Sequence, residues 1–234
     1  MRSRSKGLKN KNLKLINNKP LMYYTINNAI KSKLFENIIV STNSKKILKK
    51  AKYYGADAWF IRPKKLSLDK SPKVPVIKHA LFEAEKYYNK KFEIIIDLDV
   101  TSPLRKVEDI LNAYRYFIGK KADILVTGCK SKKNPYFNMV KVVNNKLQRV
   151  KKSKKNIYRR QDAPKIYDIN ASIYIWKRKS LVNFKSFYNG NTTFYEMPES
   201  RSWDIDSAFD FKIVKYLLSQ KWFTYIENGL SKTI

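Results

Sequence analysis

Residues 92–98 constrain the fold of this chain more than any other stretch, because they form its strongest strand candidate. They read F-E-I-I-I-D-L, and a short apolar run rich in β-branched residues is typical of a buried strand. Other short apolar runs predict strands at 37–41, 58–61 and 123–129. One-sided apolar spacing predicts helices between these strands, at about 20–33, 44–55, 74–88 and 107–119. Strands that alternate with helices predict a mostly parallel sheet with helices on both faces.

The pattern changes after residue 130. Segments 136–143 and 146–150 flank Asn144-Asn145, a dipeptide that favours a tight hairpin turn. Strand character returns at 171–176 and 194–197, and apolar spacing predicts a last helix at 207–218. Since no repeat or low-complexity linker interrupts the chain, we predict a single α/β domain over residues 1–234, with a β-rich insertion at about 130–170.

The chain opens with the basic sequence M-R-S-R-S-K-G-L-K-N-K-N, which has no apolar periodicity and is therefore a loop. Basic side chains, hydroxyls and backbone N–H groups suit a triphosphate, although composition alone favours a solvated basic terminus. In a doubly wound sheet such a loop follows a central strand, and here no strand precedes it.

We therefore expect the sequence to be a shortened form of a longer protein that lacks its first strand. A structure should then show a slot beside the strand at 37–41 or the strand at 92–98. We further expect the N-terminal loop to be weakly anchored, or another segment to fill the slot.

Three acidic residues lie where a metal site can form. Asp99 ends the strand at 92–98, and Asp204 and Asp206 alternate along an extended segment, so that their carboxylates point the same way. Such carboxylates suit Mg²⁺, which binds through one or two of them together with substrate phosphates. The alternatives are a helix N-cap for Asp206 and ordinary strand-end acids for Asp97 and Asp99.

Arg159, Arg160, Gln161 and Asn170 form a polar group near the insertion, in which Arg matches a carboxylate with its planar fork. The alternative is a solvated basic face. His79 is the only histidine, and we expect a structural role for it in the middle of a predicted helix. Because the chain has one histidine and one cysteine, we do not expect a histidine-based catalytic triad or a thiolate zinc site.

The net charge of +31 admits binding to nucleic acid or to an anionic membrane. Lysines greatly outnumber arginines, however, and are spread along the whole chain together with abundant Asn, Ile and Tyr. We interpret this charge as background lysine rather than as a specific polyanion site. No apolar run approaches the length of a membrane span, and the single Cys129 is typical of a reducing cytoplasm.

Taken together, these motifs resemble the CMP-N-acylneuraminate cytidylyltransferases, also called CMP-sialic acid synthetases. The similarity extends over about residues 2–218. The matching positions are Arg2, Ser5, Lys6, Gly7, Lys11, Asn12, Lys19–Leu21, 32–34, 39–42, Arg62-Pro63, 101–105, Arg160-Gln161, Pro164, Asn170, 173–175 and 204–206. Departures are the absent first strand, Asp99-Val100 in place of Gln-Pro, Pro72-Lys73 in place of a Ser pair, and Asp168 in place of an Arg.

The resemblance implies a Rossmann-like nucleotidyltransferase that uses Mg²⁺. It would transfer CMP from CTP to the anomeric hydroxyl of a nine-carbon 2-keto sugar acid, release pyrophosphate and form a homodimer through the insertion. The implied catalytic residues are Arg2, Lys6, Lys11, Asp204 and Asp206, with metal on Asp204, Asp206 and Asp99. The implied nucleotide-binding residues are Arg2, Ser3, Lys6, Lys11, Asn12, Arg62, Ser71 and Asp99. The implied sugar-binding residues are Arg160, Gln161, Asn170 and Tyr174.

The departures leave the sugar open among neuraminic, legionaminic and pseudaminic acids. Asp99 is a feature shared with the related 3-deoxy-manno-octulosonate enzymes, which are one alternative. A transferase that uses UTP is another, and a non-enzymatic nucleic-acid-binding protein is an alternative of a different class.

Overall fold

The structure is a computed structural model, and it describes residue 1 and residues 7–152 and 157–220. Its main sheet has four strands in the order β3-β7-β4-β8. Their bounds are Ile94–Leu98 for β3, Ile124–Lys130 for β4, Tyr167–Lys177 for β7 and Thr192–Glu196 for β8. The predicted α/β class is confirmed, and the strong strand candidate at 92–98 corresponds to β3.

The sheet is mixed rather than purely parallel. β4 and β8 are parallel, whereas β7 runs antiparallel to both β3 and β4, so three of the four strands point the same way. β7 is reversed because the chain returns to the sheet directly from the insertion. An antiparallel neighbour can be reached by such a return, whereas a parallel one requires a crossover.

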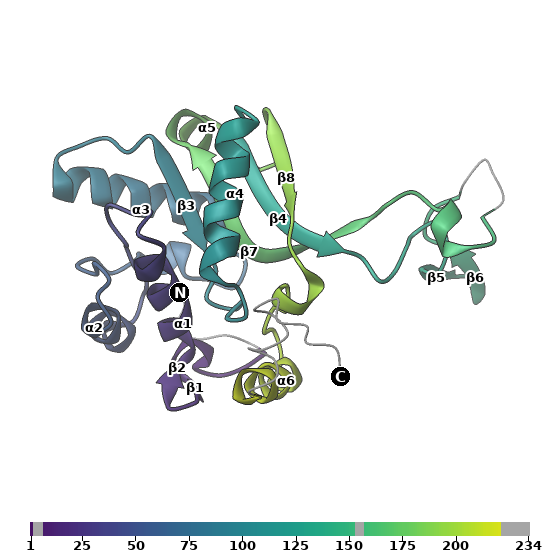
Figure 1. Cartoon of the computed structure of the whole chain (residues 1–234), viewed down its shortest axis with the longest axis horizontal. Coiled ribbons are helices and arrows are strands. Elements are labelled where there is room, and N and C mark those ends of the chain that lie inside the picture. Colours follow the sequence, from purple (N-terminus) through teal and green to yellow (C-terminus); the bar gives the residue numbers. More distant parts are fainter. Residues whose placement is uncertain (2–6, 153–156, 221–234) are drawn as a thin grey trace, which may run out of the picture.

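Helices cover both faces of this sheet, as predicted (Figure 1). On one face, α3 (Lys73–Tyr88) and α5 (Arg178–Asn183) bury Leu81 and Leu181 against Trp176. On the other face, α4 (Val107–Gly119) packs Phe117 in one cluster with Ile175 of β7. Trp176 and Ile175 lie on opposite faces because successive strand side chains alternate.

A further layer contains α1 (Leu21–Ser32), α2 (Lys45–Tyr53) and α6 (Ala208–Ser219), which meet in one apolar cluster. A small hairpin of β1 (Leu15–Ile16) and β2 (Lys19–Pro20) precedes α1. Ser207, rather than Asp206, is the N-cap of α6 and accepts a hydrogen bond from the backbone N–H of Asp210 (3.1 Å). The alternative role of Asp206 as the cap is therefore wrong, which leaves its carboxylate available.

The insertion forms an arm, residues 131–166, that projects from the body of the molecule (Figure 1). It carries a hairpin of β5 (Val140–Val143) and β6 (Lys146–Arg149). Asn144 and Asn145 make the turn with φ values of 50° and 58°, as the predicted two-residue turn requires. Short 3-10 helices complete the structure: Lys11–Leu13, Lys64–Leu66, Arg160–Asp162 and Glu199–Arg201.

The predicted strands at 37–41 and 58–61 are reduced to two isolated parallel bridges, Ile39–Asp57 and Thr42–Ile61. All five residues of β3 are only half-buried, although the sequence predicts a fully buried strand. The partial exposure of β3 has a direct cause, because a cavity of about 950 Å³ runs between segment 37–41 and β3. The expected slot is thus confirmed, whereas the expectation for the N-terminal loop concerns residues 2–6, which lie outside the described residues.

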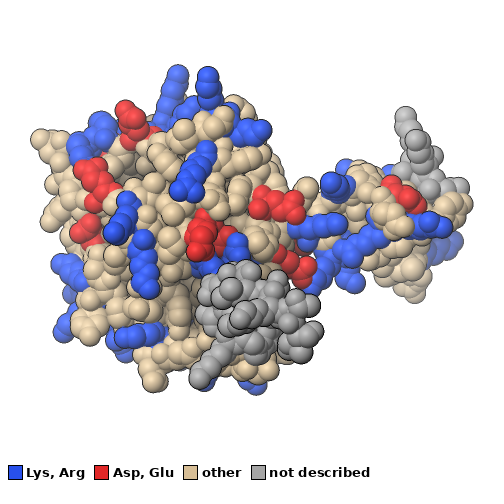
Figure 2. All heavy atoms as spheres, viewed as in Figure 1, with Lys and Arg blue, Asp and Glu red and all other residues tan. Residues whose placement is uncertain are grey.

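Lysine and arginine side chains are scattered over body and arm on the face shown in Figure 2, without gathering into a single patch on the body. This distribution supports the interpretation of the charge as background. Within the described ranges, no helix has the length and apolar character required to cross a bilayer.

Candidate active site

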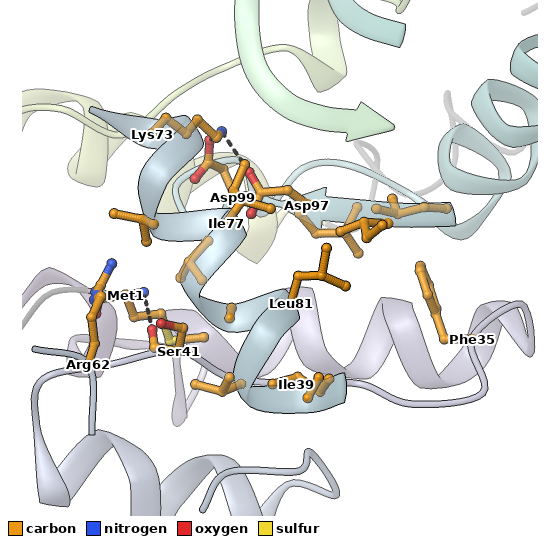
Figure 3. Close-up of a pocket in the computed structure, with 18 of the residues that line it drawn as sticks. Met1, Phe35, Ile39, Ser41, Arg62, Lys73, Ile77, Leu81, Asp97 and Asp99 are labelled. Atoms are coloured by element: carbon orange, nitrogen blue, oxygen red, sulfur yellow. Dashed lines mark hydrogen bonds and ion pairs between the residues drawn. The ribbon is translucent and has the colours of Figure 1, made fainter. Parts of the chain in front are cut away.

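The polar end of the cavity lies beyond the C-terminal end of β3, where open α/β sheets bind their ligands. Figure 3 shows Lys73, Asp97 and Asp99 together there, with Met1, Ser41 and Arg62 nearby. The charged and polar side chains that line this end are Lys11, Asn12, Arg62, Ser71, Lys73, Asp97, Asp99, Asp204 and Asp206. The structure thus brings five predicted nucleotide-binding residues, Lys11, Asn12, Arg62, Ser71 and Asp99, into one cavity.

Lys73 is the cation at the centre of this end, and the sequence analysis did not assign it to the site. It is the first residue of α3, and its Nζ forms ion pairs with Asp99 and with Asp97 Oδ2 (2.9 Å). The same ammonium lies 3.6 Å from the centroid of the Tyr174 ring. Burial lowers the pKa of Lys73, but the two carboxylates raise it further, so that its net pKa lies above the ordinary value. Lys73 therefore remains positively charged.

Arg105 holds the backbone that carries Asp99. Its guanidinium is 1% exposed and donates hydrogen bonds to the carbonyls of Ser172 (2.7 Å) and Asp99 (3.2 Å). Burial lowers the pKa of Arg105 to about 10. Burial also raises the pKa of Asp99, and the Lys73 ammonium opposes that rise. Arg105, the Arg of the T-S-P-L-R motif, thus positions the strand end, a role that the sequence analysis did not assign to it.

Asp204 and Asp206 flank Ile205, which is fully buried and donates its backbone N–H to the carbonyl of Thr101 (2.9 Å). Asp204 Oδ1 is buried and has no hydrogen-bond partner among the described residues. Burial is the main cause that raises the pKa of Asp204, and a hydrogen bond from Thr101 opposes it. The Asp206 side chain is 82% exposed and lies 3.6 Å from Lys11 Nζ.

The donor set at Asp204 and Asp206 fits a hard cation, because a buried carboxylate oxygen without a partner lies near an exposed carboxylate. Across residues 7–152 and 157–220, however, no three His, Cys, Asp or Glu side chains are grouped closely enough to hold a metal ion by themselves. Asp99 is instead paired with Lys73. This arrangement suits Mg²⁺ held by one or two carboxylates and completed by phosphate oxygens.

The end of the N-terminal loop lies against this acidic segment. Gly7 is so close to the carbonyl of Asp206 that an added Cβ would stand 1.9 Å from its oxygen. Lys11 donates a hydrogen bond to the carbonyl of Ile205, which holds its ammonium beside the acids. Arg2, Ser3 and Lys6 lie outside the described residues, so their predicted roles stay predictions.

Arg62 and Ser71 also line the cavity. Arg62 is 5% exposed and donates to the carbonyl of Met1 through its guanidinium. Ser71 closes its own loop, because its hydroxyl accepts from the N–H of Leu68 (3.0 Å) and donates to the carbonyl of Lys65 (3.0 Å). The Ser71 hydroxyl therefore shapes the rim of the cavity.

The predicted sugar-binding residues do not come together within one chain. Asn170 is buried, its Oδ1 accepts from Thr127 (2.8 Å), and its Nδ2 donates to Ser202 (2.9 Å), so its amide is used inside the fold. Tyr174 is also buried and packs against Lys73. Arg160 and Gln161 lie on the arm, where Arg160 donates to the carbonyl of Ser131 (2.8 Å).

Comparison with known proteins identifies the family and the fold. The family model described as cytidylyltransferase matches residues 1–228. The chain belongs to the cytidylyltransferase family. The resemblance drawn from the sequence is thereby confirmed, and so is the assignment of the chain to a family of transferase enzymes.

This cytidylyltransferase is 44% identical over 220 residues to the CMP-N,N'-diacetyllegionaminic acid synthase of Campylobacter jejuni, covering 94% of this chain and 93% of the relative. It is 42% identical, with the same coverage, to the post-translational flagellin modification protein B of Campylobacter coli. A solved CMP:2-keto-3-deoxy-manno-octonic acid synthetase, complexed with CTP, superimposes with a TM-score of 0.68 at 17% identity, covering 94% of this chain and 96% of that one. The last comparison shows a shared fold.

Proposed function

We propose that this cytidylyltransferase transfers CMP from CTP to the anomeric hydroxyl of a nonulosonic acid of the legionaminic type and releases pyrophosphate. The observation that carries the proposal is the polar end of the cavity, where Lys11, Asn12 and Arg62 converge with Asp204 and Asp206. The 44% identity to a CMP-N,N'-diacetyllegionaminic acid synthase over nearly the whole chain supports the choice of sugar class.

The chain's own residues would act by position and charge. Asn12 and Arg62 lie on the walls of the cavity and would contact the cytidine. Lys11, with Arg2 and Lys6 of the same loop, would hold the triphosphate and stabilise the charge that develops on the leaving pyrophosphate. Attack of the sugar hydroxyl in line with the leaving group requires alignment and no covalent enzyme intermediate.

Asp204 and Asp206 would hold Mg²⁺, because the unpartnered oxygen of Asp204 and the open carboxylate of Asp206 are suitable ligands. When bound, the ion would supply charge neutralisation for the phosphates and would favour deprotonation of a nearby hydroxyl. Lys73 pairs with both Asp97 and Asp99 and would thereby weaken their repulsion of the triphosphate. We assign the metal to the Asp204–Asp206 pair, with Asp99 as a neighbour held by Lys73.

A homodimer formed through the arm would complete the site for the sugar. Val142 is 68% exposed and Leu147 is 71% exposed, on a two-stranded hairpin that is too small to bury a core of its own. A second copy would cover these side chains. It would also carry Arg160 and Gln161 toward the sugar, which explains why these residues lie away from the acids within one chain.

Pyrophosphate release by the purified chain tests the proposal. The assay compares CTP with UTP, and N,N'-diacetyllegionaminic acid with N-acetylneuraminic, pseudaminic and 3-deoxy-manno-octulosonic acids. We expect turnover with CTP and the highest kcat/KM with the legionaminic acid. Higher kcat/KM with the octulosonic acid would overturn the sugar assignment, and turnover with UTP alone would overturn the nucleotide assignment.

The variant Asp206→Asn tests the metal assignment in the same assay. We expect turnover to fall at least ~100-fold, because a ligand that stabilises the transition state is lost. Glu108→Gln is the matched control, since Glu108 is exposed on α4 and does not line the cavity. Near-full activity of Asp206→Asn at saturating Mg²⁺ would exclude Asp206 as a ligand.

A further inference from the structure

Asp204 and Asp206 lie in irregular backbone, because residues 202–207 belong to no helix or strand. Contacts with other parts of the fold must therefore hold the two carboxylates in place. We propose that Arg201 and Asp109 are positioning residues, and that their ion pair holds this segment in the conformation that binds the metal. The proposal rests on the assignment of Mg²⁺ to Asp204 and Asp206 made above.

The ion pair joins two nitrogens of the guanidinium to both oxygens of the carboxylate. Arg201 Nε lies 2.9 Å from Asp109 Oδ2 and 3.1 Å from Oδ1, and its Nη2 lies 2.8 Å from Oδ1. The Asp109 side chain is buried, and that of Arg201 is mostly buried. Such a planar pair fixes the direction of the guanidinium as well as its distance, which a single hydrogen bond does not do.

Asp109 is itself held in the first turn of α4. Its carboxylate also accepts a hydrogen bond from the backbone N–H of Lys106 (2.9 Å), the residue that precedes the helix. Farther along α4, Phe117 packs in one cluster with Ile175 of β7. The helix therefore fixes the position of Arg201 relative to the sheet.

The spacing along the chain makes this anchor effective at Asp204. Arg201 precedes Asp204 by three residues, a distance that spans at most about 11 Å of extended chain. Directly after Asp204, the backbone N–H of Ile205 donates to the carbonyl of Thr101 (2.9 Å). Asp204 is thus held from both sides, and the anchor on the N-terminal side includes the ion pair.

One stretch of chain, residues 99–109, provides both anchors and also contains Asp99. Thr101 and Asp109 hold the acidic segment from this stretch, and Arg105 lies between them. The Arg105 guanidinium donates to the carbonyl of Asp99 (3.2 Å). The same short stretch therefore sets the position of the acidic pair relative to Asp99. This matters because the groups of a functional site must be held to within about 0.5 Å.

The alternative is that the pair only stabilises the fold. A buried ion pair is weak evidence for stability, since the cost of removing two charges from water offsets much of their attraction. The Arg201–Asp109 pair instead provides defined geometry three residues away from a proposed ligand. Interactions behind the ligands commonly orient metal sites in this way, and for this reason we infer a positioning role.

A second pair of the same type allows the two roles to be separated. Arg178 binds Glu85 through two nitrogens, with Nη2 at 2.9 Å from Oε2, and the Glu85 side chain is buried. The backbone N–H of Arg178 donates to the carbonyl of Glu93, just before β3 begins, whereas the acids lie beyond its C-terminal end. Neither Arg178 nor Glu85 lines the cavity.

The test is the dissociation constant of CTP without sugar, measured by calorimetry once in MgCl₂ and once in EDTA. We expect Arg201→Gln to weaken CTP binding at least ~10-fold in MgCl₂, the usual cost of losing a residue that orients metal ligands. In EDTA the loss should be less than about twofold, because the site then holds no metal to position. Arg201→Lys keeps the charge without the planar fork, so its loss in MgCl₂ should be intermediate.

Two further variants separate positioning from stability. Glu85→Gln removes the charge of the other pair and should change CTP binding less than about twofold in both buffers. The double variant Asp109→Asn, Arg201→Gln should bind CTP in MgCl₂ no more weakly than Arg201→Gln alone, since the two side chains act through one another. All variants are compared at a temperature at which circular dichroism shows them to be folded.

Asp206→Asn distinguishes failure of the metal assignment from failure of this inference. If MgCl₂ favours CTP binding equally in Asp206→Asn and in the unmodified chain, both the assignment and the inference are overturned. If Asp206→Asn loses that advantage while Arg201→Gln and Arg201→Lys keep it, only the inference is overturned. Equal losses of Arg201→Gln in MgCl₂ and EDTA, or an equal loss in Glu85→Gln, would also overturn it, because they would indicate general disruption of the fold.

Discussion

Replacement of Lys73 by methionine tests how much the ion pairs of Lys73 with Asp97 and Asp99 contribute to the stability of the fold. Methionine keeps an unbranched side chain of similar length and removes the ammonium. Asp97 and Asp99 then lose the ion pairs that Lys73 makes with them, one of which joins Lys73 Nζ to Asp97 Oδ2 at 2.9 Å. The cation above the Tyr174 ring is lost as well.

The expected loss of stability follows from this geometry. Two unit charges 2.9 Å apart attract each other by about 6 kcal/mol at an effective dielectric constant of about 20. Desolvation offsets much of this attraction, and the Lys73 side chain is still 33% exposed, so water screens the pair further. We expect Lys73→Met to reduce the free energy of unfolding by about 2–3 kcal/mol, which corresponds to a decrease in Tm of about 4–12 °C.

Urea denaturation of the purified variants measures this loss. Lys70→Met is the matched control, because Lys70 is an exposed lysine in the loop before α3 and should change stability by less than about 0.5 kcal/mol. Added MgCl₂ should stabilise Lys73→Met more than the unmodified chain, since a divalent cation can then occupy the Asp97–Asp99 pair. Equal stability of Lys73→Met and Lys70→Met would refute the reasoning.

Three further predictions concern acid stability, assembly and charge. Glu85 is 5% exposed and has its pKa lowered to about 2, chiefly by the hydrogen bond from Arg178. This pKa lies below the unfolded value of about 4.3, so the ionised Glu85 contributes about 3 kcal/mol to the free energy of unfolding above that pH. This contribution is lost as the pH falls from about 5 to 2. Glu85→Gln should therefore weaken the dependence of the unfolding free energy on pH in this range, as measured by urea titrations. The double variant Val142→Asp, Leu147→Asp should sediment as a monomer under conditions in which the unmodified chain is a dimer, and a dimeric variant would exclude the hairpin as the interface. Affinity for random duplex DNA should stay at the non-specific level of about 10⁻⁴–10⁻⁶ M at physiological salt, and nanomolar, sequence-selective binding would contradict a background role for the +31 charge.

Local patterns predicted several elements well. The helix expected at 107–119 is observed as α4 with the same bounds, because its apolar spacing lies within the segment itself. The hairpin turn at Asn144-Asn145 was predictable for the same reason, since it depends on a few neighbouring residues. The direction of β7 was not predictable in this way, because it depends on how the arm returns the chain to the sheet.

The residues of the candidate site likewise fall into those predictable from the sequence and those found only in the structure. Asp204, Asp206, Lys11 and Asp99 were identified from the sequence because motif order and strand ends mark them. The role of Lys73 was missed, since its partners Asp97 and Asp99 lie 24 and 26 residues away and meet it only when α3 packs beside β3. Asn170 was predicted to bind sugar, but the tertiary structure uses its amide to join Thr127 and Ser202.

The sequence by itself determined the α/β class, the helices on both faces, the hairpin in the arm and the identity of the acidic pair. Each of these depends on periodicity, turn chemistry or residue type within a short window. Only the tertiary structure decided which charges pair with one another and where a cavity lies between segment 37–41 and β3. Those features depend on contacts between segments that are distant in the sequence, and local sequence patterns do not predict such contacts.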